Sequence, residues 1–266
     1  MYLSINKPKK ATLIFYNHQR ILTVKKTLIT LCIASVSTIA SAGTGTQWGY
    51  SGHSGPENWA QLSTDNYACS GSNQSPVNLT GFIEADLTPI EFNYKSGGHE
   101  VLNNGHTIQV NYSPGSRISI DKQAFELKQF HFHAPSENHI NGNSFPLEAH
   151  YVHANDQGQL AVVAVMFKEG KENNALKNAW LGMPKVAGKK ASYASSFNAN
   201  KLLPDNKDYY RFNGSLTTPP CSEGVRWLVL KESLEASQEQ ISHFTDVIGF
   251  ENNRPLQPIN ARTILQ

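Results

Sequence analysis

The sequence predicts a mainly β protein of the α+β class: one domain on a large, twisted, mostly antiparallel central sheet with a few short peripheral helices. Short apolar or alternating segments, separated by clusters of Asn, Gly, Pro and Ser, dominate residues 43–266. Only two stretches have helical character. Neither an internal repeat nor a Ser/Gly/Pro linker divides this part of the sequence, so we expect a single folding unit.

Six segments have the pattern of strands. Ile108–Tyr112 alternates apolar and polar residues, and so does 118–120, as expected for strands with one face toward the core. Longer apolar or alternating segments follow at 124–133, 147–153, 160–167 and 226–230. Hairpin connections between neighbours of this kind favour antiparallel pairing.

Two helices are expected at the margins of the sheet. The first spans about residues 172–181. The second begins after Ser237, because Ser237 and Gln240 have the spacing of a capping box, in which two side chains satisfy the free N–H groups of the first turn.

The basic charge of the chain is confined to its N-terminus. The whole sequence has 23 Lys and Arg against 21 Asp and Glu, a net charge of +2. Six of those 23 basic residues and none of the acidic ones lie in residues 1–42, so the remainder has 17 basic and 21 acidic residues. No basic excess remains there to attract nucleic acid, and we expect no such partner.

Residues 1–42 have the features of a secretory signal behind an N-terminal extension. Lys25 and Lys26 precede an uncharged run that ends in Ala40-Ser41-Ala42, a small-residue cleavage pattern. The run is about 14 residues, shorter than the roughly 20 that a spanning helix needs. A buried N-terminal helix is the alternative. We expect a periplasmic or secreted protein, residues 43–266, with no membrane anchor, and a true translation start at position 24.

Two cysteines, Cys69 and Cys221, remain after removal of the signal. An even pair in an oxidising compartment favours one disulfide, which would close a loop of about 150 residues and typically adds 2–4 kcal/mol. Two separate buried thiols are the alternative. A metal site is less expected, because neither cysteine has a CxxC partner.

Three histidines have the spacing of a metal site. His131 and His133 are two positions apart on a predicted strand, so they share a face. His150 lies on the next predicted strand and meets them if the two strands pair. Three imidazoles with one open position are the ligand set of a catalytic zinc site. Taken alone, an H-x-H pair is equally consistent with a surface or stacked pair.

The neighbours of these histidines strengthen the zinc interpretation. Gln129 shares a face with His131, and Glu148 shares a face with His150, so each can orient a ligand through its second ring nitrogen. His153 points to the opposite face from His150, and we interpret it as a core histidine.

Six motifs follow one another between residues 48 and 262. They are Trp48-Gly-Tyr50, Leu102-Asn-Asn-Gly-His106, Gln129-Phe-His-Phe-His-Ala-Pro-Ser-Glu-Asn138, Leu147-Glu-Ala-His-Tyr-Val-His153, Gly214-Ser-Leu-Thr-Thr-Pro-Pro220 and Asn253-Arg-Pro-Leu-Gln-Pro258. Together, and in this order, they resemble the alpha-class carbonic anhydrases. The resemblance implies the fold of that family and reversible hydration of CO2 to bicarbonate and a proton.

The resemblance implies a role for each matching residue at the metal. His131, His133 and His150 would bind Zn²⁺, with Gln129, Glu148 and the main-chain carbonyl of Asn252 as their outer partners. Zinc lowers the pKa of a bound water to about 7, for which carbonic anhydrases are the standard example, and the resemblance implies that the resulting hydroxide attacks CO2. The hydroxyl of Thr217 would accept from this hydroxide and donate to Glu137.

The substrate site implied by the resemblance is an apolar wall beside the metal. Strand alternation already places Val152 on the face of His150. The resemblance adds Val162, Leu216 and Trp227, together with the backbone amide of Thr217 and the hydroxyl of Thr218. CO2 has no net dipole, so an apolar wall is the surface that suits it.

The proton released in each cycle would leave through His106, since histidine titrates near neutrality. Tyr50 and Asn104 match the family's positions along the water chain, whereas Gln109 replaces the Asn common in vertebrate members. Phe212 replaces a common tyrosine, which removes a buried hydrogen bond at a cost of about 1 kcal/mol. The Cys69 and Cys221 pair matches the disulfide of exported bacterial members.

Other functions suit parts of the same pattern. A zinc-hydroxide ester hydrolase would use the same nucleophile, and a non-catalytic carbonic-anhydrase-like zinc-binding module or a zinc store would need only the ligands. The expected partners are CO2, water and bicarbonate, and the expected assembly is a monomer or homodimer.

Overall fold

The computed structural model describes residues 47–266, so the predictions for residues 1–42 lie outside the described part of the chain. Its strands are β1 (Asn78–Leu79), β2 (Glu91–Asn93), β3 (Ser96–Asn103), β4 (Ile108–Tyr112), β5 (Arg117–Ile120), β6 (Gln123–His133), β7 (His139–Ile140), β8 (Leu147–Ala154), β9 (Leu160–Glu169), β10 (Lys190–Asn198), β11 (Tyr209–Ser215), β12 (Glu223–Leu230) and β13 (Leu234–Ala236). The α-helices are α1 (Trp59–Leu62), α2 (Asn174–Ala179) and α3 (Gln238–Ile248). Four 3₁₀ helices span Gly52–Ser54, Pro56–Asn58, Thr64–Ser70 and Ala199–Leu202.

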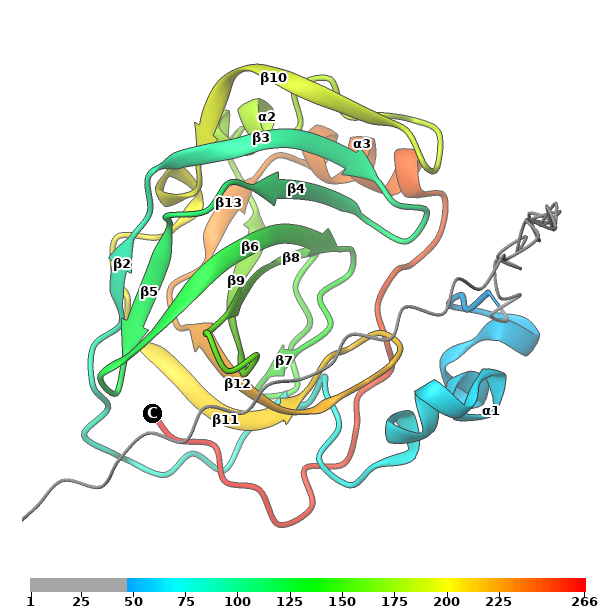
Figure 1. Ribbon diagram of the computed structural model, residues 1–266, viewed down its shortest axis with the longest axis vertical. Helices are drawn as coiled ribbons and strands as arrows, with labels where there is room; N and C mark the ends of the chain where they lie inside the picture. The colour runs from blue at the N-terminus through cyan, green and yellow to red at the C-terminus, as the bar shows by residue number, and fades with distance from the viewer. Residues whose placement is uncertain (1–46) are drawn as a thin grey trace, which may run out of the picture. The chain divides into compact units, whose positions relative to one another are not determined.

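A curved sheet of 11 strands organises the described residues (Figure 1). Its main path runs β10-β3-β4-β6-β8-β9-β12-β11, with β13 beside β9 and the β2–β5 pair attached to β6. Neighbouring strands are antiparallel except where β9 meets β12 and β13. A separate parallel pair joins β1 to β7. The predicted architecture, a mostly antiparallel sheet with short helices around it, is confirmed.

The six predicted strands correspond to β4, β5, β6, β8, β9 and β12. The first predicted helix is shorter than expected, because α2 ends at Ala179. The second begins as predicted, with both hydrogen bonds of the Ser237–Gln240 capping box formed. No sequence pattern predicted β1, β2, β3, β7, β10, β11 or β13. β3 begins with Ser96-Gly97-Gly98 and β10 is mostly exposed, so neither carries a strong apolar pattern.

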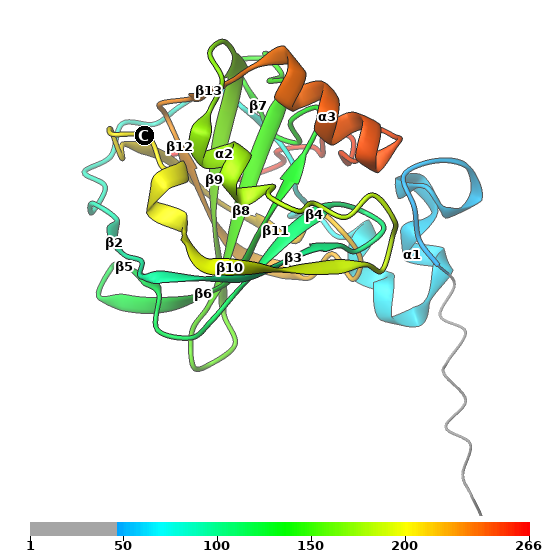
Figure 2. The ribbon, with the colours of Figure 1, turned by 90° about the horizontal axis from the view of Figure 1, so that it is seen from above.

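The two faces of the sheet have different coverings. One face holds the larger core, which includes Phe130, Phe132 and Tyr151, and α2 and α3 pack against it (Figure 1, Figure 2). The other face holds a smaller apolar cluster around Val162 and Trp227. Side chains that alternate along β6 and β8 therefore point either into the larger core or toward the smaller cluster. The three histidines of the motif face the smaller cluster.

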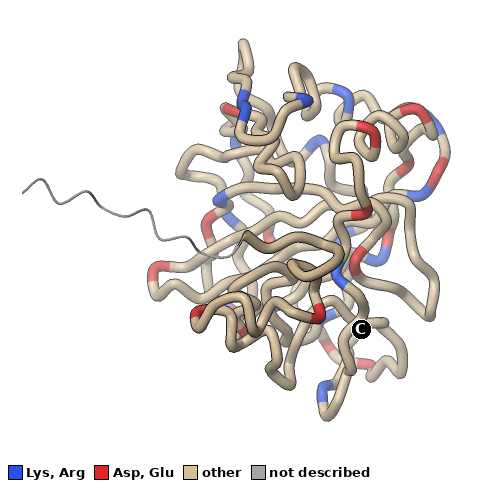
Figure 3. Tube along the Cα trace, turned by 90° about the vertical axis from the view of Figure 1, so that its right-hand side faces the viewer, with Lys and Arg blue, Asp and Glu red and all other residues tan. Residues whose placement is uncertain are grey.

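A disulfide and mixed surface charge complete this part of the molecule. Cys69 and Cys221 are bonded, with their Cα atoms 4.9 Å apart, so the predicted pairing is confirmed. Acidic and basic positions are interspersed over the face seen in Figure 3. Among the described residues, no helix has the length and apolar character that crossing a membrane requires.

Candidate metal centre

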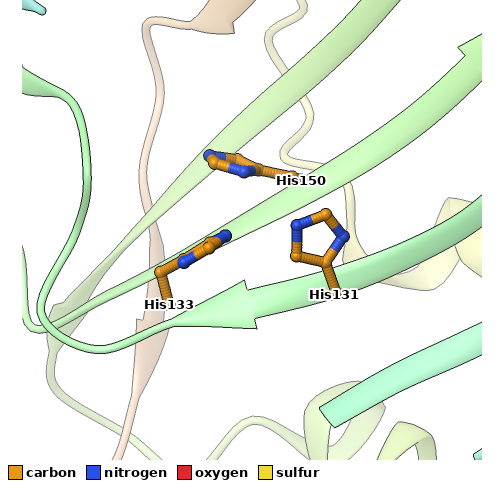
Figure 4. Close-up of side chains that lie close together, drawn as sticks. All are labelled: His131, His133 and His150. Atoms are coloured by element: carbon orange, nitrogen blue, oxygen red, sulfur yellow. The ribbon is translucent and has the colours of Figure 1, made fainter. Parts of the chain in front are cut away.

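Three imidazoles converge on the face of the sheet opposite α2 and α3 (Figure 4). His131 and His133 come from β6, and His150 comes from β8, where it lies directly across from His131 in the strand register. Their ring centroids are 4.6 to 5.4 Å apart. The alternation of side chains along β6 and the pairing of β6 with β8 are sufficient to bring the three rings together.

Each ring uses one nitrogen to contact an oxygen of the surrounding protein. The contacts are His131 Nδ1 to Gln129 Oε1 (2.8 Å), His133 Nδ1 to Asn252 O (2.6 Å) and His150 Nε2 to Glu148 Oε1 (2.8 Å). A carbonyl or carboxylate oxygen can only accept, so each of these ring nitrogens donates its hydrogen. The other nitrogen of each ring then carries a lone pair, and it is this nitrogen that faces the centre of the group.

The arrangement fits a bound metal cation. One nitrogen from each of the three rings lies within 4.8 Å of the others. Burial lowers the pKa of all three imidazoles, which favours the neutral form that binds metal. His133 Nε2 and Glu137 Oε2 are buried, lie 3.5 Å apart and have no hydrogen-bond partner among the described residues. Converging lone pairs in a buried site repel one another unless a cation lies between them, and three imidazoles suit Zn²⁺.

Glu148 is surrounded by hydrogen-bond donors on both of its oxygens. Its Oε2 accepts from the main-chain N–H groups of Glu137 (2.7 Å) and Asn138 (2.9 Å). Its Oε1 accepts from Asn138 Nδ2 (2.8 Å) and His150 Nε2 (2.8 Å). Burial raises the pKa of Glu148, while the donors from Asn138 lower it. Because all four contacts are donors, only a group that accepts on both oxygens satisfies them.

The Glu137 carboxyl lies near ring nitrogens that the outer oxygens leave free, with its Oε2 3.5 Å from His133 Nε2. Its Oε1 accepts from the main-chain N–H of Arg254 (2.9 Å), and its Oε2 is 3.8 Å from His150 Nδ1. Burial raises the pKa of Glu137 well above its ordinary value, and the nearby Thr217 hydroxyl opposes this rise. Thr217 is itself buried. A carboxylate and a hydroxyl therefore border the space in front of the lone pairs.

The loop that carries Thr217 is anchored from several directions. Ser215, at the end of β11, exchanges hydrogen bonds with Ser75 at 2.9 and 3.1 Å. Further along the loop, the Cys221 N–H donates to the Thr218 carbonyl (2.9 Å), and the disulfide joins Cys221 to Cys69. These contacts anchor the loop that carries Thr217 and Thr218 at both of its ends.

An apolar wall adjoins the histidines. Val162 and Trp227 are buried, and Val152 and Leu216 pack against them. The ring of Trp227 lies 4.9 Å from that of His150. Phe212 stacks on Trp227 with an interplanar angle of 8°, so the replacement of tyrosine leaves the wall apolar.

His106 lies in the turn between β3 and β4. Its ring stacks on Trp48, with centroids 3.7 Å apart, and both line a cavity of about 650 Å³ that also includes Tyr50 and Phe250. Burial lowers the pKa of His106 and raises that of Tyr50 well above its usual range. Of the other proton-path residues, Asn104 contacts Gln109 at 3.5 Å, and Gln109 donates to Asn111 at 2.6 Å.

Comparison with known proteins agrees with this geometry. The family model of eukaryotic-type carbonic anhydrases matches residues 54–266. The chain belongs to the carbonic anhydrase family. It is 48% identical to a carbonic anhydrase of Neisseria gonorrhoeae over 242 residues, which are 90% of this chain and 96% of the relative. It is also 48% identical to one from Pectobacterium carotovorum over 232 residues, 87% of this chain and 95% of the relative.

A solved structure extends the comparison to three dimensions. The alpha-carbonic anhydrase of Thermovibrio ammonificans, solved with the inhibitor sulfanilamide, superposes with a TM-score of 0.81 at 49% identity and covers 83% of this chain and 99% of its own. Membership of the family makes this chain an enzyme of CO2 hydration. The recognition of an alpha-class carbonic anhydrase from its motifs is therefore confirmed.

Some features of the site were missed by the sequence analysis. The buried guanidinium of Arg254 donates to Gln74 Oε1 (2.8 Å), the Ser75 carbonyl (2.8 Å) and the Cys69 carbonyl (3.0 Å). The side chain of Asn252 and the hydroxyl of Thr107 were also overlooked. The one signal in the sequence was position: Arg254 lies in the last family motif, and Asn252 lies directly before it. Their hydrogen-bond partners could not be predicted, because those partners lie far away along the chain.

Proposed function

We propose that the chain is a zinc enzyme that reversibly hydrates CO2 to bicarbonate and a proton. The observation that carries this proposal is the convergence of three imidazole lone pairs from His131, His133 and His150 in a buried site. Zinc held by these three residues would supply the Lewis acidity that lets a water ionise near neutral pH, which is the nucleophile that CO2 hydration requires. Gln129, Glu148 and the Asn252 carbonyl keep each ring in the tautomer that binds metal.

Thr217 and Glu137 orient the attacking oxygen. A metal cation beside Glu137 would favour its ionised form, which can only accept, so the Thr217 hydroxyl would donate to it and keep its oxygen as an acceptor toward the nucleophile. The hydrogen of the nucleophile is thereby held toward Thr217, and a lone pair is left to face CO2. The buried positions of both side chains and the anchoring of Glu137 by the Arg254 N–H support this role.

The apolar wall of Val152, Val162, Leu216 and Trp227 receives CO2. A linear molecule without a net dipole loses little hydration on entering such a surface, whereas an ester needs room for two substituents around its carbonyl. The backbone amide of Thr217 and the hydroxyl of Thr218 lie on the anchored loop beside the wall, where they contact a substrate oxygen.

His106 transfers the proton to bulk solvent. Its half-buried ring lines the cavity that Trp48 and Tyr50 share, and in this proposal a chain of waters past Asn104 and Gln109 would connect it to the metal centre. In His106→Ala, turnover should fall in weak buffer and be partly restored by added imidazole. Turnover that does not depend on buffer would contradict this assignment.

The test of the zinc proposal is stopped-flow CO2 hydration by residues 43–266 before and after chelation. We expect the rate to fall to the uncatalysed level as zinc is removed and to return on addition of one equivalent. A rate that persists after metal analysis shows the zinc to be gone would refute the proposal.

We also propose that the protein is exported. The Cys69–Cys221 disulfide supports an oxidising compartment, and the pattern of residues 1–42 supports a cleaved signal. The protein recovered from the periplasm or medium should begin at Gly43. A precursor peptide from residues 1–23, found by mass spectrometry, would contradict a start at position 24.

A further inference from the structure

The backbone of His106 is tied to the strand that carries two of the metal ligands. Its N–H donates to Asn104 Oδ1 (2.9 Å), which closes the turn locally. Its carbonyl accepts from Asn252 Nδ2 (3.0 Å), across 146 positions of sequence. The ring stacks on Trp48 at the cavity wall. The two backbone contacts fix the position of the His106 main chain, and therefore the point from which the side chain extends.

The side chain of Asn252 reaches β6 as well as His106. The same Nδ2 donates to the Phe132 carbonyl (2.9 Å), and Oδ1 accepts from the Ala134 N–H (2.9 Å). Asn252 is completely buried, so both N–H bonds of its amide are used within the protein. Its main-chain carbonyl meanwhile holds His133 Nδ1 (2.6 Å). One buried residue therefore contacts both a metal ligand and the backbone of His106.

Thr107 makes a second, independent connection to the same strand. Its hydroxyl donates to the Phe132 carbonyl (2.5 Å) and accepts from the Phe132 N–H (3.2 Å). Phe132 lies between His131 and His133, and the regular pairing of β4 with β6 reaches only as far as Gln109 opposite His131. The Thr107 hydroxyl thus continues the ladder by one residue, and it meets Asn252 at a shared carbonyl.

We propose that the side chains of Asn252 and Thr107 are positioning residues for proton transfer: they hold His106 at a fixed place relative to the metal ligands. The inference rests on the proposed role of His106 as the proton carrier. Transfer through water depends on the distance and alignment of successive groups, so a shift of the turn would interrupt it. Neither side chain needs to touch the substrate for this effect.

The kinetic test compares Thr107→Val with Thr107→Ser and adds Asn252→Asp. Valine keeps the shape of threonine but removes the hydroxyl, whereas serine keeps the hydroxyl. Aspartate removes both donors of Asn252 but keeps its main-chain carbonyl. Attack on CO2 precedes proton removal, so kcat/KM reports the attack and kcat in weak buffer reports proton transfer.

We expect Thr107→Val to lower kcat in weak buffer by about 3- to 10-fold and to leave kcat/KM and zinc content within about twofold. Imidazole should restore the loss, and Thr107→Ser should behave as wild type. Asn252→Asp should lower kcat by a larger factor than kcat/KM. A parallel loss of kcat and kcat/KM that imidazole does not restore, or no loss in Thr107→Val, would overturn the inference.

A spectroscopic readout separates this inference from the proposed function. Because His106 stacks on Trp48, ring currents should shift its carbon-bound ring protons upfield in the NMR spectrum, and His106→Ala assigns them. Thr107→Val should move these resonances toward their random-coil positions, and Thr107→Ser should not. Unchanged resonances would overturn the inference even in a fully active enzyme. Loss of zinc-dependent CO2 hydration in wild type would instead refute the proposed function.

Discussion

Two histidines three positions apart on β8 differ in how their ring nitrogens are used. His150 and His153 are both buried, with 1% and 0% of their surface exposed, and burial lowers the pKa of each. His153 uses both ring nitrogens: Nε2 contacts the Tyr94 hydroxyl (2.7 Å) and Nδ1 contacts the Ala161 carbonyl (3.2 Å). His150 uses only Nε2, and its Nδ1 faces the other two imidazoles. Burial alone therefore does not distinguish a ligand from a core residue.

The surroundings of the two rings explain the difference. On the His153 side, Tyr94, Phe130 and Tyr151 form an aromatic core that supplies enough polar atoms to satisfy one imidazole. On the His150 side, the outer oxygens fix the tautomers, and the inner nitrogens have no hydrogen-bond partner among residues 47–266. A binding site arises where buried polar atoms are oriented but not satisfied.

The largest effect should come from removing a ligand on the site face. In His150→Ala we expect zinc content to fall below a tenth of an equivalent and CO2 hydration to fall at least about 1,000-fold, measured by metal analysis and stopped flow. His153→Leu is the matched control, which should keep zinc and lose about 1–3 kcal/mol in the free energy of unfolding. Loss of zinc from folded His153→Leu would show that metal binding also depends on the core face, which would contradict the comparison.

The next effect concerns orientation without metal binding. Thr217→Ala should keep zinc and lower kcat/KM about 100-fold, the usual cost of one lost polar group at the reacting atoms. Thr217→Ser keeps the hydroxyl and should retain most of the rate. Unchanged turnover in Thr217→Ala would refute the proposed orienting role of Thr217. The three histidines would then account for the activity without it.

Glu148→Gln probes the outer oxygens of the site face. Four N–H groups donate to the two oxygens of Glu148, and an amide replaces one of these oxygens with an NH2 group that cannot accept. The contact that orients His150 is thereby weakened. We expect zinc affinity to weaken by about 10- to 100-fold in a chelator competition. Gln129→Glu, which keeps an acceptor beside His131, is the matched control and should weaken zinc binding less. Equal affinity in Glu148→Gln and wild type would show that the tautomer of His150 is not set by this contact.

The smallest effect is the pH dependence of the core face. The pKa of His153 is lowered to about 4 in the folded protein, whereas an unfolded chain has an ordinary value near 6.5. Between these values the unfolded chain binds a proton that the folded one does not, so stability falls as the pH falls. From pH 7 to pH 5, His153 alone should lower the free energy of unfolding by about 2 kcal/mol. Urea unfolding should show this loss in wild type and not in His153→Leu.

Much of the site was predictable because its key pattern is local. Strand alternation together with the assumed pairing of two successive strands grouped His131, His133, Gln129, Glu148 and His150, and the structure brings the three histidines together as that pairing implies. The six strands and the α3 cap were likewise visible in short windows. The fold beyond them was not, since β3, β10 and β11 have weak patterns and acquire their partners only in the sheet.

A bulge in β6 shows where local reasoning ends. Phe125 and Leu127 lie on the larger core, yet strict alternation would place them on the same face as His131 and His133. The register shift between Leu127 and Gln129, opposite His153 and Val152, reverses the parity. The extra residue lets both the odd-numbered apolar pair and the later even-numbered Phe130 and Phe132 reach one core.

The sequence by itself determined the ligand residues, their shared face, the family and the candidate disulfide, because strand periodicity and motif order are properties of neighbouring residues. Only the tertiary structure decided which oxygen meets His133, how Arg254 holds Glu137, and how Asn252 connects the metal ligands to His106. Those contacts join residues more than 100 positions apart, and their hydrogen bonds exist only once the sheet has closed around them.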